Sequence, residues 1–151
     1  MPLVHRRVYT IAVPSEIGEF ADEVHQIFQE LGRGYGPESL ASECTPGIDV
    51  YETDEAMEIV VDLPGVTPDS VRLVVKGRSL LVAGEKPRRR ARNEATFHLV
   101  ERGYGRFARV VRLDRACDPA RAQAAVRGGE LRISLPKIAE RRGTRIPIAM
   151  T

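Results

Sequence analysis

The sequence predicts an all-β fold: an immunoglobulin-like β-sandwich preceded by a helical arm and followed by an extended tail. Two observations carry this prediction. After Pro46-Gly47, short segments rich in Val, Ile and Leu alternate with polar residues and are separated by turn signals. No long helical pattern lies between these segments, which argues against a βαβ architecture. The length of 151 residues fits one domain with extensions.

Composition indicates a soluble globular protein. The hydrophobic fraction of 42% and the charged fraction of 29% are ordinary for a folded domain. No stretch reaches the roughly 18 apolar residues of a membrane span. Cys44 and Cys117 are far apart and have no metal-ligand spacing, so free thiols in a reducing compartment are expected. The sequence therefore favours a cytoplasmic protein without membrane contact.

Charge is distributed unevenly along the chain. The net charge is only +2, but residues 8–71 hold fourteen carboxylates and one base, whereas residues 72–151 hold twenty bases and seven acids. Such polarity can pair the two halves within one fold, or pair one subunit with another. Both alternatives remain open from the sequence.

The arm contains an amphipathic helix, predicted from Glu16 to Leu31. Ser15 is a suitable N-cap, and the glycines that begin at Gly32 end the helix. Its polar face is strongly acidic. Apolar residues recur on the other face at three- and four-residue spacing: Ile17, Phe20, Val24, Ile27, Phe28 and Leu31.

Alternation and turn residues place the strands. Gly77-Arg78 and Gly128-Gly129 suit two-residue hairpin turns, and Pro64-Gly65 suits a turn with a positive φ at its second residue. In the last strand one face is apolar and the other is polar, so one side is buried. The predicted strands are Ile48 to Glu52, Met57 to Leu63, Val71 to Lys76, Ser79 to Gly84, Phe97 to Glu101, Phe107 to Leu113, Ala122 to Arg127 and Glu130 to Leu135.

Four motifs in order give the chain a family resemblance. They are Gly47-Ile48-Asp49-Val50-Tyr51-Glu52, the turn Asp62-Leu63-Pro64-Gly65-Val66, the segment Glu101-Arg102-Gly103-Tyr104-Gly105-Arg106-Phe107, and Gly129-Glu130-Leu131. Together they resemble the α-crystallin domain of bacterial small heat-shock proteins. The resemblance implies an arm at 1–45, an α-crystallin domain at 46–137 and a C-terminal extension at 138–151. In the family pattern, an apolar residue is usual at Glu130 and a proline at Asp114.

The resemblance also implies a function. Small heat-shock proteins are ATP-independent holdases that assemble as oligomers of dimers and capture unfolding proteins, without a cofactor, metal or catalytic site. In bacterial and plant members the dimer forms by exchange of a strand, which here corresponds to Phe97, His98, Leu99, Val100 and Glu101. Arg109 matches the family's arginine near the dimer interface.

The tail Ile146-Pro147-Ile148 matches the family's I-x-I/V signature. Ile146 and Ile148 project to the same side of an extended backbone, and Pro147 restricts the backbone before docking. Burying both isoleucines contributes ~3 to 6 kcal/mol before ordering costs, which permits release. The resemblance places the acceptor groove between the family's fourth and eighth strands, at Val71, Leu73, Val75, Ala122, Ala124 and Val126.

The apolar stripe of the arm admits two interpretations. It is buried inside an oligomer, or it also contacts unfolding clients; one surface can serve both uses in alternation. The alternative function for the whole chain is a co-chaperone or scaffold module with the same sandwich. Paired arms are unusual in such modules.

Other readings of the sequence have weaker support. The run from Lys86 to Arg92 is basic, but no nucleic-acid motif surrounds it, so a solvated loop is favoured over contact with nucleic acid. His5, His25 and His98 lie in separate segments without ligand spacing. Cys117 with His98 is a weak nucleophile and base pair, since no recognisable motif surrounds either residue. An enzyme is therefore not expected.

Overall fold

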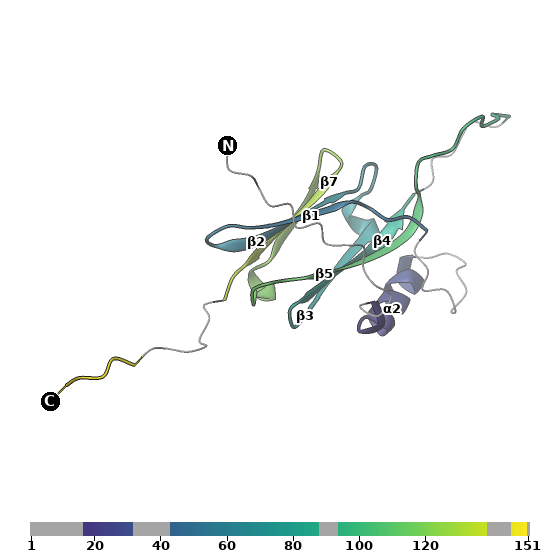
Figure 1. Cartoon of the computed structure of the whole chain (residues 1–151). Helices are drawn as coiled ribbons and strands as arrows, with labels where there is room; N and C mark the ends of the chain where they lie inside the picture. The colour runs from purple at the N-terminus through teal and green to yellow at the C-terminus, as the bar shows by residue number, and fades with distance from the viewer. Residues whose placement is uncertain (1–16, 32–42, 88–93, 139–145, 151) are drawn as a thin grey trace.

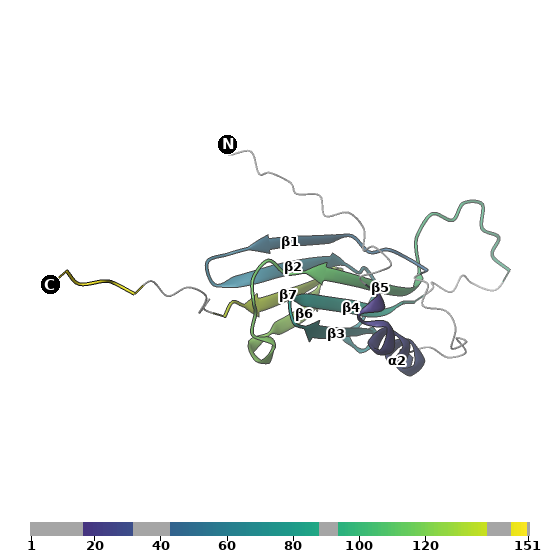
Figure 2. The ribbon, with the colours of Figure 1, turned by 60° about the horizontal axis from the view of Figure 1, so that its bottom comes forward.

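Two antiparallel sheets stack face to face in the computed structural model, which describes residues 17–31, 43–87, 94–138 and 146–150 (Figures 1 and 2). The four-stranded sheet has the order β1-β2-β7-β6, and the three-stranded sheet has the order β3-β4-β5. This arrangement confirms the predicted all-β sandwich. Its strands are β1 (Ile48–Glu52), β2 (Ala56–Asp62), β3 (Val71–Lys76), β4 (Ser79–Lys86), β5 (Gly105–Arg112), β6 (Gln123–Arg127) and β7 (Glu130–Pro136).

The predicted turns are confirmed by the backbone. Gly77 has φ +60° and joins the register partners Lys76 and Ser79. Gly128 and Gly129, with φ +59° and +78°, close the hairpin between β6 and β7. In the Pro64-Gly65 turn, Gly65 has φ +80° and the Val66 amide donates to the Leu63 carbonyl at 3.2 Å. These positive φ values explain the glycines, since other residues rarely adopt them. Short 3₁₀ helices, η1 (Pro68–Ser70) and η2 (Pro119–Arg121), lie in two further connections.

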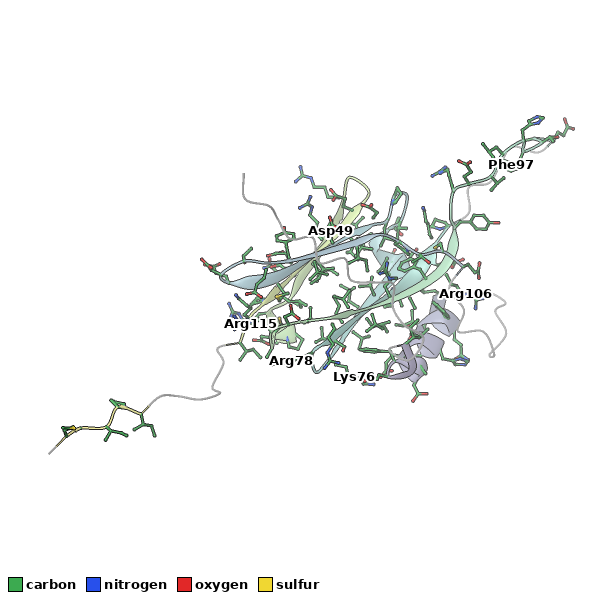
Figure 3. All side chains as sticks on the ribbon, viewed as in Figure 1. Asp49, Lys76, Arg78, Phe97, Arg106 and Arg115 are labelled. Carbon is green, nitrogen blue, oxygen red and sulfur yellow. The ribbon has the colours of Figure 1, made fainter. Side chains whose placement is uncertain are left out.

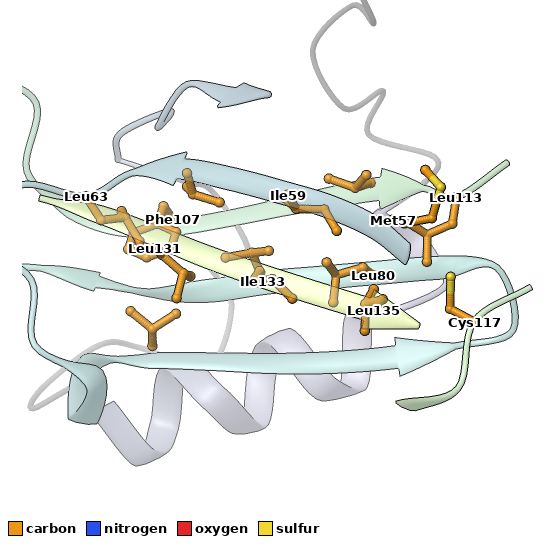
Figure 4. Packing of buried hydrophobic residues seen from close by; sticks show 14 of the residues in the cluster. Met57, Ile59, Leu63, Leu80, Phe107, Leu113, Cys117, Leu131, Ile133 and Leu135 are labelled. Carbon is orange, nitrogen blue, oxygen red and sulfur yellow. The ribbon is translucent and has the colours of Figure 1, made fainter. Parts of the chain in front are cut away.

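The main core fills the space between the two sheets (Figure 4). Ile59 and Ile133 are register partners on β2 and β7, and Phe107 faces them from β5. Alternation along each strand sends these side chains inward, as the sequence indicates. The largest fully buried side chains of this core are Phe107, Ile59, Leu63, Leu80, Leu113, Ile133 and Leu135.

A second apolar cluster lies on the outer side of the three-stranded sheet, beneath helix α2 (Ala21–Leu31). Figures 1 and 2 both place α2 against this sheet and away from the four-stranded one. As a result β4 is buried on both faces: Leu80 points into the sandwich and Leu81 points to the helix. The molecule therefore has three layers, a helix and two sheets.

The helix departs from its predicted extent. It ends at Leu31 as expected, but a turn at Glu19 and Phe20 separates α2 from the helical residues Ile17 and Gly18. There the Phe20 amide donates to the Ile17 carbonyl at 2.9 Å, a three-residue spacing. Gly18 weakens the helix locally, which accounts for the interruption. The predicted start and its N-cap, Ser15, lie outside the described residues.

The strand predicted at Phe97 to Glu101 does not form within the single chain. A strand requires a neighbour, and nothing in the described part of this chain pairs with the segment. The segment belongs to the described loop residues 94–104 of the β4–β5 connection, and the register partners Lys86 and Gly105 flank this connection. The β4–β5 ladder is thus continuous up to the point where the loop begins. The other predicted strands are present: β1 and β3 have the predicted bounds, and the bounds of the rest differ by one or two residues.

Candidate functional site

The loop between β4 and β5 exposes a run of apolar side chains. Phe97, Leu99 and Val100 are 59%, 73% and 61% exposed, and Figure 3 shows Phe97 in the loop that extends beyond the end of the sandwich. His98 and Glu101 are also exposed. The predicted dimer segment is therefore uncovered in one chain, which suits a surface that a partner covers.

Arg109 lies on β5, the outer strand of the three-stranded sheet, opposite Val82 on β4. Its Nη1 donates to the Pro46 carbonyl, which ties β5 to the residues that lead into β1. Its Nε is buried and has no hydrogen-bond partner within the described chain. Burial lowers the pKa of Arg109. The unused Nε–H of this guanidinium can donate a hydrogen bond to an acceptor group that approaches from outside the chain.

The tail is uncovered as well. Ile146 and Ile148 are 82% and 91% exposed, so neither isoleucine of the signature contacts an apolar surface of its own chain.

The two predicted acceptor strands, β3 and β6, each form one of the two edges of their sheets and lie on the same side of the sandwich (Figures 1 and 2). Leu73, Val75 and Val126 are half-buried against the edge of the core. Ala124 faces Ile133 across the ladder, so it also points to the core side. Ala122 and Ala124 are exposed, whereas Val71 is already buried. Five of the six predicted positions thus retain surface that a tail could cover.

The arm residues occupy a place that sequence reasoning missed. Phe20, Val24, Ile27 and Phe28 are buried against the outer face of the three-stranded sheet, and Ile17 and Leu31 are half-buried there. A signal for this contact exists in the sequence. The run Leu80-Leu81-Val82-Ala83 has no alternation, which is typical of a strand covered on both faces.

Ion pairs within the chain connect its acidic and basic halves. Glu23, Glu43 and Glu52 come from the acidic half, and each reaches a base of the other half. The pairs are Lys76–Glu23 at 2.5 Å, Arg106–Glu43 at 2.7 Å, Lys137–Glu52 at 3.1 Å, Arg115–Glu52 at 3.7 Å and Arg72–Glu30 at 3.7 Å. The acidic and basic halves therefore pair inside one chain. This favours pairing within the fold over pairing between subunits.

The histidines and the cysteine considered as metal ligands or catalytic residues do not form one site in the described part of the chain. His5 lies outside the described residues, His25 is on α2 and His98 is in the exposed loop. Cys117 is buried in the core, and burial raises the pKa of its thiol, so this cysteine is poorly suited to act as a nucleophile. Among the described residues, no cluster of three or more metal-ligating side chains occurs, and no helix is long and apolar enough to cross a membrane.

The two-sheet sandwich, with its exposed apolar loop and tail, places the chain in the small heat-shock class of proteins. The chain belongs to the Hsp20/alpha crystallin family, whose model matches residues 49–149.

Individual relatives agree with this assignment. Small heat shock protein C4 of Rickettsia felis is 30% identical over 105 residues, which cover 70% of this chain and 64% of that protein. The chain thus spans just under two thirds of that relative's length. The structure of heat shock protein 16.0 from Schizosaccharomyces pombe superposes with a TM-score of 0.60 at 31% identity, covering 72% of this chain and 100% of that one. A small heat-shock protein from Xylella fastidiosa, described as having a distinct high order structure, gives 0.59 at 27% identity with the same coverage.

Proposed function

We propose that the protein is an ATP-independent holdase of the cytoplasm, which binds unfolding proteins and prevents their aggregation. One observation carries the proposal: apolar segments in the loop and the tail, containing Phe97, Leu99, Ile146 and Ile148, are exposed in an otherwise well-packed sandwich. Exposed apolar surface of this kind is typical of protein interaction sites. The family's chaperone role agrees with it.

The dimer forms in this proposal by exchange of the segment from Phe97 to Glu101. The segment pairs with an outer strand of the partner, which supplies the backbone partners it lacks in its own chain. Arg109 lies beside the entry to β1, and its unused Nε donates to an acceptor that the partner brings. The exposed Phe97, Leu99 and Val100 become covered in the same step.

Dimers join into larger oligomers through the tail. Ile146 and Ile148 dock on the edge formed by β3 and β6, where Leu73, Val75 and Val126 are half-buried. This contact is a latch that heat can open, since two isoleucines contribute only ~3 to 6 kcal/mol before ordering costs. The arm at 1–45, the α-crystallin domain at 46–137 and the extension at 138–151 then have separate roles in one assembly.

The function is tested by heat-induced aggregation of citrate synthase, followed by light scattering without nucleotide. At an equimolar subunit ratio the protein is expected to suppress the scattering, whereas the same mass of serum albumin should not. Full scattering in the presence of the protein would refute the holdase proposal. Monomers on a gel-filtration column would refute the assembly and would favour a co-chaperone or scaffold module.

A further inference from the structure

The outer face of the three-stranded sheet is apolar, although an antiparallel sandwich usually leaves such a face to water. Five side chains form this outer sheet face, four of them buried under α2 and Val74 half-buried: Val74, Leu81, Ala83, Ala108 and Val110. They come from all three strands, so the face is continuous across the sheet. We use the term outer sheet face for these residues below.

Helix α2 occupies this face in the manner of a bound peptide. Its apolar stripe covers the face, and its two flanking carboxylates reach cations on β3. Lys76 Nζ lies 2.5 Å from Glu23 Oε1 and 3.1 Å from the Glu19 carbonyl, and Arg72 lies 3.7 Å from Glu30. Lys76 also sits 5.4 Å from the centroid of the Phe20 ring.

These contacts give the surface a defined geometry. Arg72 and Lys76 are four residues apart on a strand, which spans about 13 Å. Glu23 and Glu30 are seven residues apart on a helix, which spans about 10.5 Å, so each carboxylate can reach one of the two cations at the same time. Because Glu23 meets Lys76 and Glu30 meets Arg72, the helix runs antiparallel to β3. Any competing helix must repeat this spacing.

The contact between α2 and the outer sheet face is weak enough for another helix to replace α2. A helix of 11 residues is marginal in water on its own, so α2 depends on the sheet for its structure. Arg72 and Glu30 are both well exposed, and such pairs contribute little. At the other end, Glu23 Oε2 is buried without a hydrogen-bond partner in the described chain, which makes the fit imperfect.

We propose that the outer sheet face is a binding surface for amphipathic helices of other proteins, with α2 as a built-in competitor. The preferred partner has an apolar stripe flanked by acidic residues seven positions apart. The identification of these partners as segments of unfolding proteins rests on the proposed function. The surface itself rests on the packing and charges of α2, Arg72 and Lys76.

The experiment measures binding of a fluorescein-labelled peptide with the sequence of residues 17–31 to the full chain by fluorescence anisotropy. The full chain carrying Val24→Asp and Phe28→Asp has a detached α2 that cannot cover the face of a second copy. Removing the competitor raises the fraction of open sites, so this variant is expected to bind the peptide at least tenfold more tightly than the wild-type chain.

A charge exchange tests the geometry. A second peptide carries Glu23→Lys and Glu30→Lys, and it should bind the detached variant at least fivefold more weakly at low salt. Adding Arg72→Glu and Lys76→Glu to the protein should reverse the preference. Equal binding of both peptides, or no binding by a detached variant that keeps its β-sheet circular dichroism and cooperative melting, would overturn the proposal.

A second variant and a separate assay make the result interpretable. If the detached variant does not fold, Arg72→Glu with Lys76→Glu in the otherwise wild-type chain is used, and it must prefer the lysine peptide for the proposal to stand. The aggregation assay is separate. Suppression of scattering without peptide binding would leave the holdase proposal intact and would reject the binding surface on the outer sheet face. Peptide binding without suppression would support the binding surface and reject the holdase proposal.

Discussion

Arg106 and Glu43 form an ion pair with 2.7 Å between Nε and Oε1, at a place where Arg106 is only 7% exposed. The same guanidinium lies 5.3 Å from the centroid of the Phe28 ring on α2. The Arg106 carbonyl also accepts from the amides of Glu43 and Cys44. One β5 residue thus contacts both the helix and the segment that leads into β1, which fixes where the arm meets the sandwich.

The tail prediction concerns assembly. Ile146→Ala with Ile148→Ala removes the apolar surface of the latch, and the native mass measured by mass spectrometry should fall from oligomers to dimers. Met150→Ala is the matched control, because Met150 is equally exposed in the same tail. Oligomers of unchanged mass in the double variant would contradict the latch.

The dimer prediction concerns Arg109. Arg109→Ala removes a buried donor near the proposed interface, and loss of such a charge costs ~2 to 5 kcal/mol of association. The dimer dissociation constant is measured by sedimentation in the variant that also carries Ile146→Ala and Ile148→Ala. It should rise at least tenfold. Arg112→Ala on the same strand is the control, because Arg112 is exposed. An equal effect of both substitutions would argue against a specific role for Arg109.

A stability prediction concerns Gly84 on β4. A Cβ at this position would lie 2.1 Å from the Ser70 carbonyl oxygen and 3.0 Å from the Phe107 ring. Gly84→Ala should therefore lower the free energy of unfolding by ~1 to 3 kcal/mol. Gly47→Ala, where the nearest atom is 3.7 Å away, should change it by less than about 0.5 kcal/mol. Chemical denaturation of both variants makes the comparison, and equal stabilities would contradict it.

The packing of α2 predicts a coupling between Leu81 and Phe28, which lie in the same cluster. In a double-mutant cycle, Leu81→Ala and Phe28→Ala should show an interaction free energy of ~0.5 to 3 kcal/mol. Leu80→Ala with Phe28→Ala is the control pair, because Leu80 points to the opposite side of β4. Additive effects in the first pair would mean that α2 does not rest on the sheet in solution.

A pH prediction follows from Glu23. The hydrogen bond from Lys76 lowers the pKa of Glu23 below its ordinary value of 4.5. A depressed pKa stabilises the docked helix above the ordinary pKa, and this contribution is lost as the pH falls through the lowered value. Docking of α2 should therefore weaken in acid below about pH 4.

The pH prediction is tested by the fluorescence emission of a single introduced Trp. The chain has no Trp, so Phe28→Trp gives emission from the buried face of α2 alone. The emission should shift to the red on acidification, and this shift should be smaller when Lys76→Met is added, because docking then no longer lowers the pKa of Glu23. Coincident titrations with and without Lys76 would show that other carboxylates control the helix.

The sandwich could be predicted from the sequence because its signals are local. The turn glycines Gly77, Gly128 and Gly129 adopt the positive φ values that their spacing implies, and inward alternation on β7 holds from Leu131 to Leu135. The family resemblance predicts sites in the loop and the tail, whose apolar residues the structure leaves exposed.

The docking of α2 could not be predicted in the same way. An amphipathic helix shows that one face is covered, but its periodicity does not identify the cover. The decisive residues, Leu81 and Phe28, are far apart in the sequence, and the ion pairs at Lys76 and Arg72 depend on how β3 turns its side chains. In the sequence, only the unbroken apolar run of β4 indicates a second layer.

The pairing of Lys86 with Gly105 completes the β4–β5 ladder without the residues that connect the two strands. The loop leaves and re-enters the sheet at directly opposed residues, so residues 87–104 are topologically an insertion into a plain hairpin. The cost of closing such a loop grows only slowly with its length. A chain of this fold can therefore lengthen or shorten this connection while the registry of β4 and β5 beneath it stays the same.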